Sequence, residues 1–267
     1  MHTNNKQFSG SWAIILGGSS GFGLAAIEKL AAHGMNIALL YRETAAPERT
    51  LRQQLLKFAE KNAVTIAPFN INALDTPARQ LFIKEIAATI PKQGVKLLLH
   101  SIARGNLKPL IADDSRSELS IDDIQLTTYA MSTSILEWAR ELLKADLFNE
   151  DARIIGLTSE GADKYWEGYA AVSMAKSSLE SLTTYMAVEL SKYGLKTNLI
   201  QAGITETPSL MRIPDSKKLL ENAITRNPFG RMTKPSDVAN VIYLLCTDEA
   251  AWINGTVIHV DGGEHCR

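Results

Sequence analysis

The sequence contains few cysteines and has no excess of either charge. Only two of its 267 residues are cysteine, Cys246 and Cys266, which excludes a disulfide-stabilised scaffold and a cysteine-based zinc module. Lys and Arg number 28 and Asp and Glu 29, so the net charge is −1 and the clustered positive charge of nucleic-acid-binding proteins is missing. The histidines show no ligand spacing. We therefore expect neither a nucleic-acid partner nor a metal site.

Long apolar runs are also missing. The longest is far shorter than the roughly 20 residues of a membrane-spanning helix. The first residues, Met1 to Trp12, are polar and lack the apolar core of a secretory signal. With 45% hydrophobic and 21% charged residues, the chain has the composition of a globular protein. These features predict a cytoplasmic protein without a membrane segment, folded as a single dinucleotide-binding and catalytic domain over residues 1–267.

Short apolar runs typical of strands alternate with longer segments typical of helices. Several runs, such as Trp12 to Leu16, are apolar throughout, as expected for strands covered by helices on both faces. The alternation predicts an α/β fold, a Rossmann-type doubly wound parallel sheet of about seven strands. The predicted strands are 12–16, 36–40, 64–68, 95–100, 153–157, 196–200 and 256–260, and the predicted helices are 24–33, 48–61, 77–90, 121–144, 169–193 and 235–246.

One stretch, residues 205–231, fits neither pattern. It has no clear period over most of its length and contains several prolines. In a doubly wound sheet, a connection of this kind lies over the carboxyl edge of the strands, where ligands bind. We therefore predict an irregular substrate-binding excursion there.

A glycine-rich segment, Gly17-Gly18-Ser19-Ser20-Gly21-Phe22-Gly23, follows the first predicted strand and leads into the first predicted helix. Glycines allow a sharp turn and let the backbone approach a pyrophosphate that rests on the helix N–H groups. A bare glycine cluster is also compatible with a simple tight turn, but its place after the first strand favours a dinucleotide site. The predicted cofactor contacts here are Gly17, Ser19, Ser20, Gly21, Phe22 and Gly23.

The end of the second predicted strand is where the adenosine ribose is recognised. A carboxylate there favours the free 2′-hydroxyl of NAD, whereas an arginine suits the 2′-phosphate of NADP. Tyr41 stands where the acid is expected, and Arg42 follows it. The sequence therefore predicts NADP(H) in preference to NAD(H), bound by Arg42. The alternative is a solvated Arg42 paired with Glu43.

The spacing Gly17-x-x-x-Gly21-x-Gly23 resembles that of the short-chain dehydrogenase/reductase family, and the resemblance extends nearly from end to end. The pair Asn70-Ile71 is similar to the adenine-contacting pair of that family. The segment 202–207 (Ala-Gly-Ile-Thr-Glu-Thr) resembles its Pro-Gly-x-x-x-Thr loop, with alanine in place of proline. The resemblance implies further cofactor contacts at Asn70, Ile71, Gly203, Ile204, Thr205 and Thr207.

The Tyr-x-x-x-Lys motif usual in that family is altered in this chain. Lys176 is the evident lysine, but Val172, four residues earlier, cannot transfer a proton, and the tyrosine is Tyr169. Spacings of four and seven residues return to one helix face, so Tyr169 and Lys176 can still face one site. A displaced tyrosine suits the reduction of a double bond conjugated to a thioester, because the oxygen then lies two bonds further from the carbon that accepts hydride than it does in a ketone.

A Tyr-x6-Lys spacing also marks the enoyl-acyl carrier protein reductases of the family. The segment His100-Ser101-Ile102-Ala103 resembles their His-Ser-Ile-Ala, and the segment from Tyr165 to Tyr169 is most similar to their NADPH-using branch. His100 is expected to be a hydrogen-bonded structural residue. The resemblance implies cofactor contacts for Ser101, Ile102, Ala103 and Lys176, and substrate contacts for Ser159, Tyr165 and Tyr169.

The function that this resemblance implies is NADPH-dependent reduction of trans-2-enoyl thioesters in fatty acid biosynthesis, with Tyr169 and Lys176 as catalytic residues. It also implies an acyl carrier protein-linked substrate and a homotetramer. Two alternatives stay open: a ketone, 3-oxoacyl or alcohol dehydrogenase of the same fold, and a non-enzymatic redox sensor that binds the cofactor. Val172 argues against the first, and the intact Tyr169–Lys176 pair argues against the second.

Overall fold

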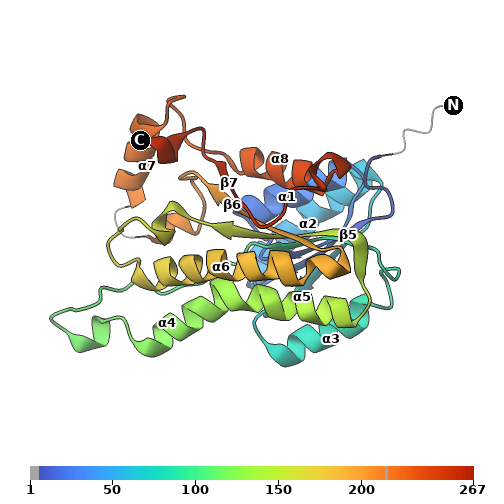
Figure 1. Cartoon of the computed structure of the whole chain (residues 1–267), viewed down its shortest axis with the longest axis horizontal. Helices are drawn as coiled ribbons and strands as arrows, with labels where there is room; N and C mark the ends of the chain where they lie inside the picture. Colours follow the sequence, from blue (N-terminus) through green and yellow to red (C-terminus); the bar gives the residue numbers. More distant parts are fainter. Residues whose placement is uncertain (1–5, 214–215) are drawn as a thin grey trace.

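The computed structural model describes residues 6–213 and 216–267, which form an α/β fold around one parallel sheet (Figure 1). The strand order is β3-β2-β1-β4-β5-β6-β7, so the predicted doubly wound sheet is confirmed. The strands are β1 (Trp12–Leu16), β2 (Asn36–Tyr41), β3 (Ile66–Asn70), β4 (Val95–His100), β5 (Phe148–Thr158), β6 (Lys196–Ala202) and β7 (Val257–Val260).

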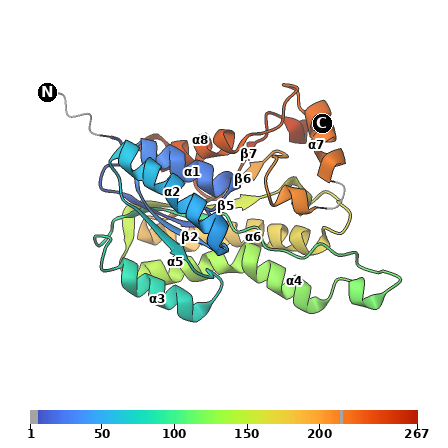
Figure 2. The same ribbon diagram turned by 180° about the vertical axis from the view of Figure 1, so that it is seen from behind.

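Helices cover both faces of this sheet. On one face lie α1, α2 and α8, and on the other lie α3, α5 and α6 (Figures 1 and 2). The helices are α1 (Gly21–Ala32), α2 (Ala45–Asn62), α3 (Thr76–Ile86), α4 (Ile121–Thr128), α5 (Ser134–Lys144), α6 (Ala170–Glu189), α7 (Ser216–Arg226) and α8 (Pro235–Cys246).

The two faces explain why the strands are apolar throughout. Ile14 of β1 belongs to a core cluster that includes Phe82 of α3 and Trp138 of α5. The next residue, Ile15, belongs to a second cluster, which includes Ile27 of α1. Because successive side chains of a strand point to opposite faces, both sets of positions must be apolar when both faces are buried.

The predicted helix over 121–144 is confirmed in its bounds, but it is not α-helical throughout. Residues Tyr129–Thr133 form a π-helical segment between α4 and α5. Such a segment accommodates an extra residue within a helix, a local change that a regular hydrophobic period does not reveal. Two other helices are shorter than predicted, since the helix predicted over 77–90 ends at Ile86 and the one predicted over 169–193 spans Ala170–Glu189 before a short 3₁₀ turn.

The prediction of a wholly irregular excursion over 205–231 is wrong, because it contains helix α7. Leu219 and Ala223 of this helix are buried and lie one turn apart, which gives a narrow apolar stripe. Because the stripe has only two apolar residues and several prolines lie nearby, the spacing of apolar residues does not predict this helix. In space, helix α7 lies close to the carboxyl terminus of the chain, beyond the carboxyl edge of the sheet (Figure 1).

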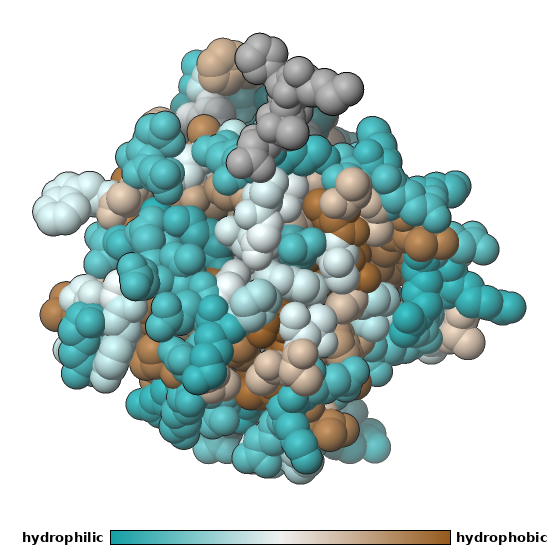
Figure 3. Space-filling view, turned by 90° about the vertical axis from the view of Figure 1, so that its right-hand side faces the viewer, coloured by the Kyte–Doolittle hydropathy of each residue, from teal (hydrophilic) through white to brown (hydrophobic). Residues whose placement is uncertain are grey.

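The surface is mixed in character. Figure 3 shows apolar residues scattered among hydrophilic ones on the face that it presents. Within the described ranges, no helix combines the length and apolar character needed to cross a bilayer.

A cluster of charges holds the amino end of β5 to its neighbours. Asp151 accepts hydrogen bonds from Arg153 Nη1 at 2.6 Å, from Lys96 Nζ of β4 at 2.8 Å, and from Lys196 Nζ of β6. Arg153 is buried and also donates to the backbone oxygen of Leu245 at 2.7 Å. Burial opposes ionisation of Asp151, yet the hydrogen bonds from the three cations hold the pKa of its carboxyl well below the usual range.

We predict that Asp151→Asn lowers the free energy of unfolding at pH 7 by about 3 kcal/mol, because it leaves buried cations without a counter-charge. Since the pKa is depressed in the folded state, the contribution is present above the unfolded value, about 3.9, and is lost as the pH falls through the lower folded value. Urea denaturation at pH 7 and in acid measures both effects. Asp146→Asn is the control, since Asp146 pairs with an exposed Lys92, and its effect should stay within about 0.5 kcal/mol. Equal losses in both variants would contradict the prediction.

Candidate active site

The loop between β1 and α1 is shaped by close backbone contacts. Gly17 has a φ of +83°, and a Cβ at this position would lie 2.5 Å from the backbone oxygen of Ser101. A Cβ on Gly23 would lie 2.4 Å from the backbone oxygen of Gly17. No larger residue fits at either position, so the loop after β1 lies directly against the loop after β4.

The first turn of α1 is suited to an anion. Ser20 is the N-cap residue, but its side chain makes no capping hydrogen bond. Ser19 and Phe22 are half-buried beside it. A Cβ on Gly21 would lie 3.4 Å from Thr207 Cγ2, so the loop after β6 reaches the same turn. An uncapped helix N-terminus flanked by glycine and hydroxyl side chains fits a pyrophosphate.

The ends of β2 and β3 form a second corner. Asn70 Nδ2 donates to Glu48 Oε2 and to the backbone oxygen of Glu43, both at 2.9 Å. The hydroxyl of Tyr41 donates to Glu48 Oε1 at 3.1 Å. Arg42 is exposed, and among the described residues it forms no ion pair with Glu43 or any other acid. Its guanidinium can therefore receive a phosphate. The other predicted residues of this edge, Ile71, Ser101, Ile102 and Ala103, directly follow β3 and β4.

The loop after β6 is held by the carboxyl end of the chain. The backbone N–H of Ile204 donates to Glu264 Oε2 at 3.3 Å, and Thr205 Oγ1 donates to the backbone oxygen of Gly203 at 2.9 Å. Glu264 is buried, and this burial raises the pKa of its carboxyl although Arg226 acts in the opposite direction. Sequence reasoning missed Glu264, because only the folded chain brings residue 264 to residue 204.

The two predicted catalytic residues lie near the carboxyl end of β5. Lys176 Nζ donates to the backbone oxygen of Leu157 at 2.7 Å, and Ser159 Oγ, just after the strand, accepts from the backbone N–H of Gly161 at 3.2 Å. Tyr169 is the N-cap of α6 and therefore precedes the helix that was predicted to begin with it. A Cβ on Gly161 would lie 2.6 Å from Tyr169 Cε1, so glycine leaves room for the aromatic ring.

Burial controls the charge of these groups. It raises the pKa of Tyr169, against the hydrogen bond from Ser159, so the phenol stays protonated at neutral pH. Burial lowers the pKa of Lys176 to about 8, which leaves most of the lysine charged at pH 7. Burial, reinforced by Lys176, lowers the pKa of His100 to about 3. Neutral His100 lies 2.8 Å from Ser134 Oγ, which confirms the predicted hydrogen-bonded structural histidine.

Val172 occupies a tightly packed apolar cluster. It is 4% exposed and packs with Ala130, Met131 and Ala175. A Cβ on Gly105 would lie 2.7 Å from Val172 Cγ2, which shows how closely the neighbouring loop approaches. An aromatic side chain at position 172 would need space that the backbone near Gly105 occupies.

Tyr165 lies apart from this cluster. Its side chain is 87% exposed, and its predicted substrate contact stays a prediction.

Thr127, on α4, is buried, donates to the backbone oxygen of Asp123 at 2.7 Å and accepts from the backbone N–H of Asn106 at 3.1 Å. Its hydroxyl is therefore occupied in holding the loop before α4.

With this geometry in view, a family model described as "Enoyl-(Acyl carrier protein) reductase" matches residues 17–265. The chain belongs to the short-chain dehydrogenase/reductase family. Its similarity within the family extends to enoyl-acyl carrier protein reductases, as the sequence predicted.

Relatives in the short-chain dehydrogenase/reductase family carry different names. The chain is 33% identical to the enoyl-acyl-carrier-protein reductase (NADH) FabI of Aquifex aeolicus over 172 residues, 63% of this chain and 62% of that enzyme. It is 24% identical to the 3-oxoacyl-acyl-carrier-protein reductase FabG of Escherichia coli, over 96% of this chain and 98% of that enzyme. A crystal structure of the Bacillus cereus enoyl-acyl carrier protein reductase with NADP+ and indole naphthyridinone shares the fold, with a TM-score of 0.84 at 23% identity, covering 98% of this chain and 99% of that one.

Family membership makes the protein an oxidoreductase with a nucleotide-cofactor-binding fold. The residues present fit a dinucleotide. The uncapped turn of α1 and the close contacts of Gly17 and Gly23 leave space for a pyrophosphate, and Lys176 is directed to the strand end that faces it.

Arg226 is a further residue that the sequence did not reveal. Its Nη2 donates to Glu160 Oε1 at 2.6 Å and to the backbone oxygen of Glu264 at 3.1 Å. Glu160 directly follows Ser159, and Glu264 holds Ile204. One arginine at the end of α7 therefore connects the excursion to both the catalytic strand end and the cofactor loop. No sequence spacing links these three positions.

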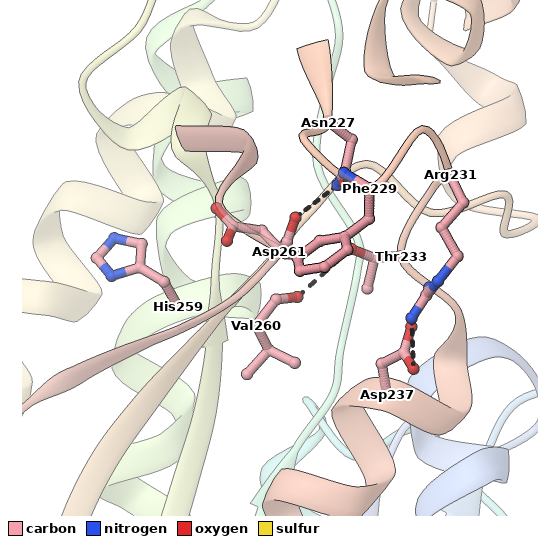
Figure 4. A pocket seen from close by; sticks show the side chains of 9 residues that line it. Asn227, Phe229, Arg231, Thr233, Asp237, His259, Val260 and Asp261 are labelled. Atoms are coloured by element: carbon pink, nitrogen blue, oxygen red, sulfur yellow. Dashed lines mark hydrogen bonds and ion pairs between the residues drawn. The ribbon is translucent and has the colours of Figure 1, made fainter. Parts of the chain in front are cut away.

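A pocket of about 210 Å³ lies beside this site (Figure 4). In Figure 4, Asn227 is hydrogen-bonded to the backbone of Asp261, and Arg231 is paired with Asp237. None of the residues predicted to bind cofactor or substrate lines this pocket. In the described part of the chain, no three or more His, Cys, Asp or Glu side chains are grouped to hold a metal ion.

We predict that Gly17→Ala weakens binding of NADPH at least about tenfold, because the added methyl group would push the loop away from Ser101. Gly10→Ala is a matched control. Gly10 has the same φ of +83°, but a Cβ there meets nothing within 4 Å. Fluorescence titration with NADPH measures the affinity, and circular dichroism verifies that both variants fold. Equal affinities of the two variants would refute the role of the close contact.

Proposed function

We propose that the protein is an enoyl-acyl carrier protein reductase that reduces trans-2-enoyl thioesters with NADPH in fatty acid biosynthesis. The observation that carries the proposal is the exchange at the start of α6: Val172 is packed into an apolar cluster, and the tyrosine stands instead at the N-cap, seven residues before the Lys176 that is bound to the end of β5. The description of the family model and the name of the Aquifex relative support it. The proposal treats residues 1–267 as one cofactor-binding and catalytic domain.

When bound, the nicotinamide would supply a hydride to the β-carbon of the enoyl thioester. The protonated hydroxyl of Tyr169 would donate a hydrogen bond, and then a proton, to the thioester oxygen on which negative charge develops. Ser159 is assigned a further contact to the substrate. Lys176 binds the ribose hydroxyls, and its positive charge makes Tyr169 a stronger donor. The Gly203–Thr205 loop fixes the orientation of the carboxamide.

The same proposal assigns the cofactor contacts. Gly17 to Gly23 hold the pyrophosphate, Asn70 and Ile71 contact the adenine, and Ser101 to Ala103, after β4, contact the cofactor on the other side of β1. The exposed Arg42, without an acidic partner among the described residues, favours the 2′-phosphate of NADPH. The Aquifex relative is named for NADH, so this preference is a property proposed for the present chain.

The protein is also proposed to be a cytoplasmic homotetramer that takes its substrate from acyl carrier protein. Exposed apolar side chains on α6 support association with further copies, since Met174, Tyr185 and Val188 are 49%, 64% and 71% exposed.

Reduction of a 3-oxoacyl thioester is the second candidate. Ser159 favours it, because ketone reductases carry a serine donor at this position. The FabG relative, which covers nearly the whole chain, also supports it. The two substrates differ only in the group that is reduced, so a direct comparison separates the candidates.

Tyr169→Phe is predicted to lower kcat for crotonyl thioester by about 100-fold, because the proton donor is removed while the ring is kept. Tyr193→Phe, which removes an exposed hydroxyl, is the control and should leave kcat unchanged. Oxidation of NADPH at 340 nm gives the rates. Faster wild-type turnover of acetoacetyl thioester than of crotonyl thioester would favour the ketone reductase, and unchanged turnover in Tyr169→Phe would exclude the assigned role.

Arg42→Ala is predicted to raise KM for NADPH about tenfold with little change for NADH, because a charge-assisted contact to the 2′-phosphate is lost. Arg140→Ala, an exposed arginine of α5, serves as the control. Steady-state kinetics with both cofactors measures the effect. An equal rise for NADPH and NADH would show that Arg42 does not read the phosphate.

A further inference from the structure

Two consecutive residues at the end of β5 each hold a different residue of α6. The backbone oxygen of Leu157 accepts a hydrogen bond from Lys176 Nζ at 2.7 Å. The next residue, Thr158, donates from Oγ1 to Glu180 Oε1 at 2.6 Å. The first contact belongs to the proposed catalytic pair, whereas Glu180 has no role in the chemistry described so far.

Lys176 needs a counter-charge in its surroundings. Its side chain is only 6% exposed, and its one hydrogen bond among the described residues goes to a neutral carbonyl. A buried ammonium without a nearby anion loses its proton or its position. Burial lowers the pKa of Lys176, and Glu180 is the group that acts in the opposite direction.

The helix places Glu180 where this charge is required. Glu180 follows Lys176 by four residues, so both side chains lie on one face of α6. The hydroxyl of Thr158, itself only 6% exposed, holds the half-buried carboxylate of Glu180 against the strand end.

We propose that Glu180, held by Thr158, is a positioning residue that keeps Lys176 charged and directed toward the ribose of the cofactor. The inference rests on the proposed function in one respect, the binding of the cofactor ribose by Lys176. Glu180 acts through Lys176 and does not touch the reacting atoms.

The other groups around Lys176 cannot replace this carboxylate. His100 approaches from β4 and is neutral, because burial and the charge of Lys176 lower its pKa to about 3. Tyr169, at the start of α6, is held protonated by burial, which raises its pKa. Among the described residues, Glu180 is therefore the one anion that acts on Lys176.

The test is a pH titration of Lys176 in the cofactor-free protein by NMR of the lysine side chains, with the signal assigned from Lys176→Arg. In Glu180→Gln the ammonium should titrate at lower pH than in the wild type. Affinity for NADPH should match the wild type at pH 6, where Lys176 is charged in both proteins, and should be about threefold to tenfold weaker at pH 8.5. A merely structural role would weaken binding equally at both pH values.

Glu189→Gln, which removes an exposed acid of the same helix, is the matched control and should change neither measurement. Thr158→Val should also lower the pH at which Lys176 titrates. If Glu180→Gln does not fold, Thr158→Val is used for the test in its place. In Glu180→Asp, Lys176 should titrate at a pH between those of the wild type and Glu180→Gln. An unchanged Lys176 titration in the folded variants overturns the inference. Absence of crotonyl thioester turnover in the wild type would overturn the proposed function and leave this titration unaffected.

Discussion

Between β1 and β4 the sheet changes the direction in which strands are added, and the loops that follow these two strands leave toward opposite faces. The contact of Gly17 with the backbone of Ser101 lies at this point. Except for Lys176 on α6, every predicted cofactor residue lies at or shortly after the carboxyl end of β1, β2, β3, β4 or β6, so the topology gathers them at one edge. The glycines then determine how closely the loops approach, and hence whether a dinucleotide fits between them.

The nearly neutral chain conceals two groups of buried charges at opposite ends of β5. At the amino end, three cations share the carboxylate of Asp151 and join β4, β5 and β6. At the carboxyl end, Lys176 contacts the strand through a carbonyl. The first arrangement gives its three cations a shared counter-charge and joins the strands. The second leaves a cation available to a ligand, which is the difference expected between a structural and a functional site.

Much of this could be predicted from the sequence, because it depends on local order along the chain. Apolar runs such as residues 12–16 predicted the positions of the strands. The glycine segment and the Tyr169–Lys176 spacing predicted the residues of the candidate site. The failures involve contacts between distant segments. Glu264 meets Ile204 and Arg226 meets Glu160 only after folding, and their spacing carries no periodic signal. The π-helical segment and α7 were missed for another reason, since a single wide turn and a two-residue apolar stripe are weaker than the periodicity used to find helices.

The position of Tyr169 at the N-cap separates two properties that the common Tyr-x-x-x-Lys arrangement couples. Lys176 lies within α6, whereas Tyr169 continues the connection from β5 and is joined to the helix by a backbone hydrogen bond from Ser173 N–H at 2.9 Å. Under the proposed function, changes in residues 160–168 would move the proposed proton donor relative to the cofactor while leaving the lysine in place. Such an arrangement lets the distance between the substrate carbon that accepts hydride and the substrate oxygen that accepts the proton vary among related enzymes, without a change in cofactor binding. One fold can therefore accommodate substrates whose reacting atoms are differently spaced.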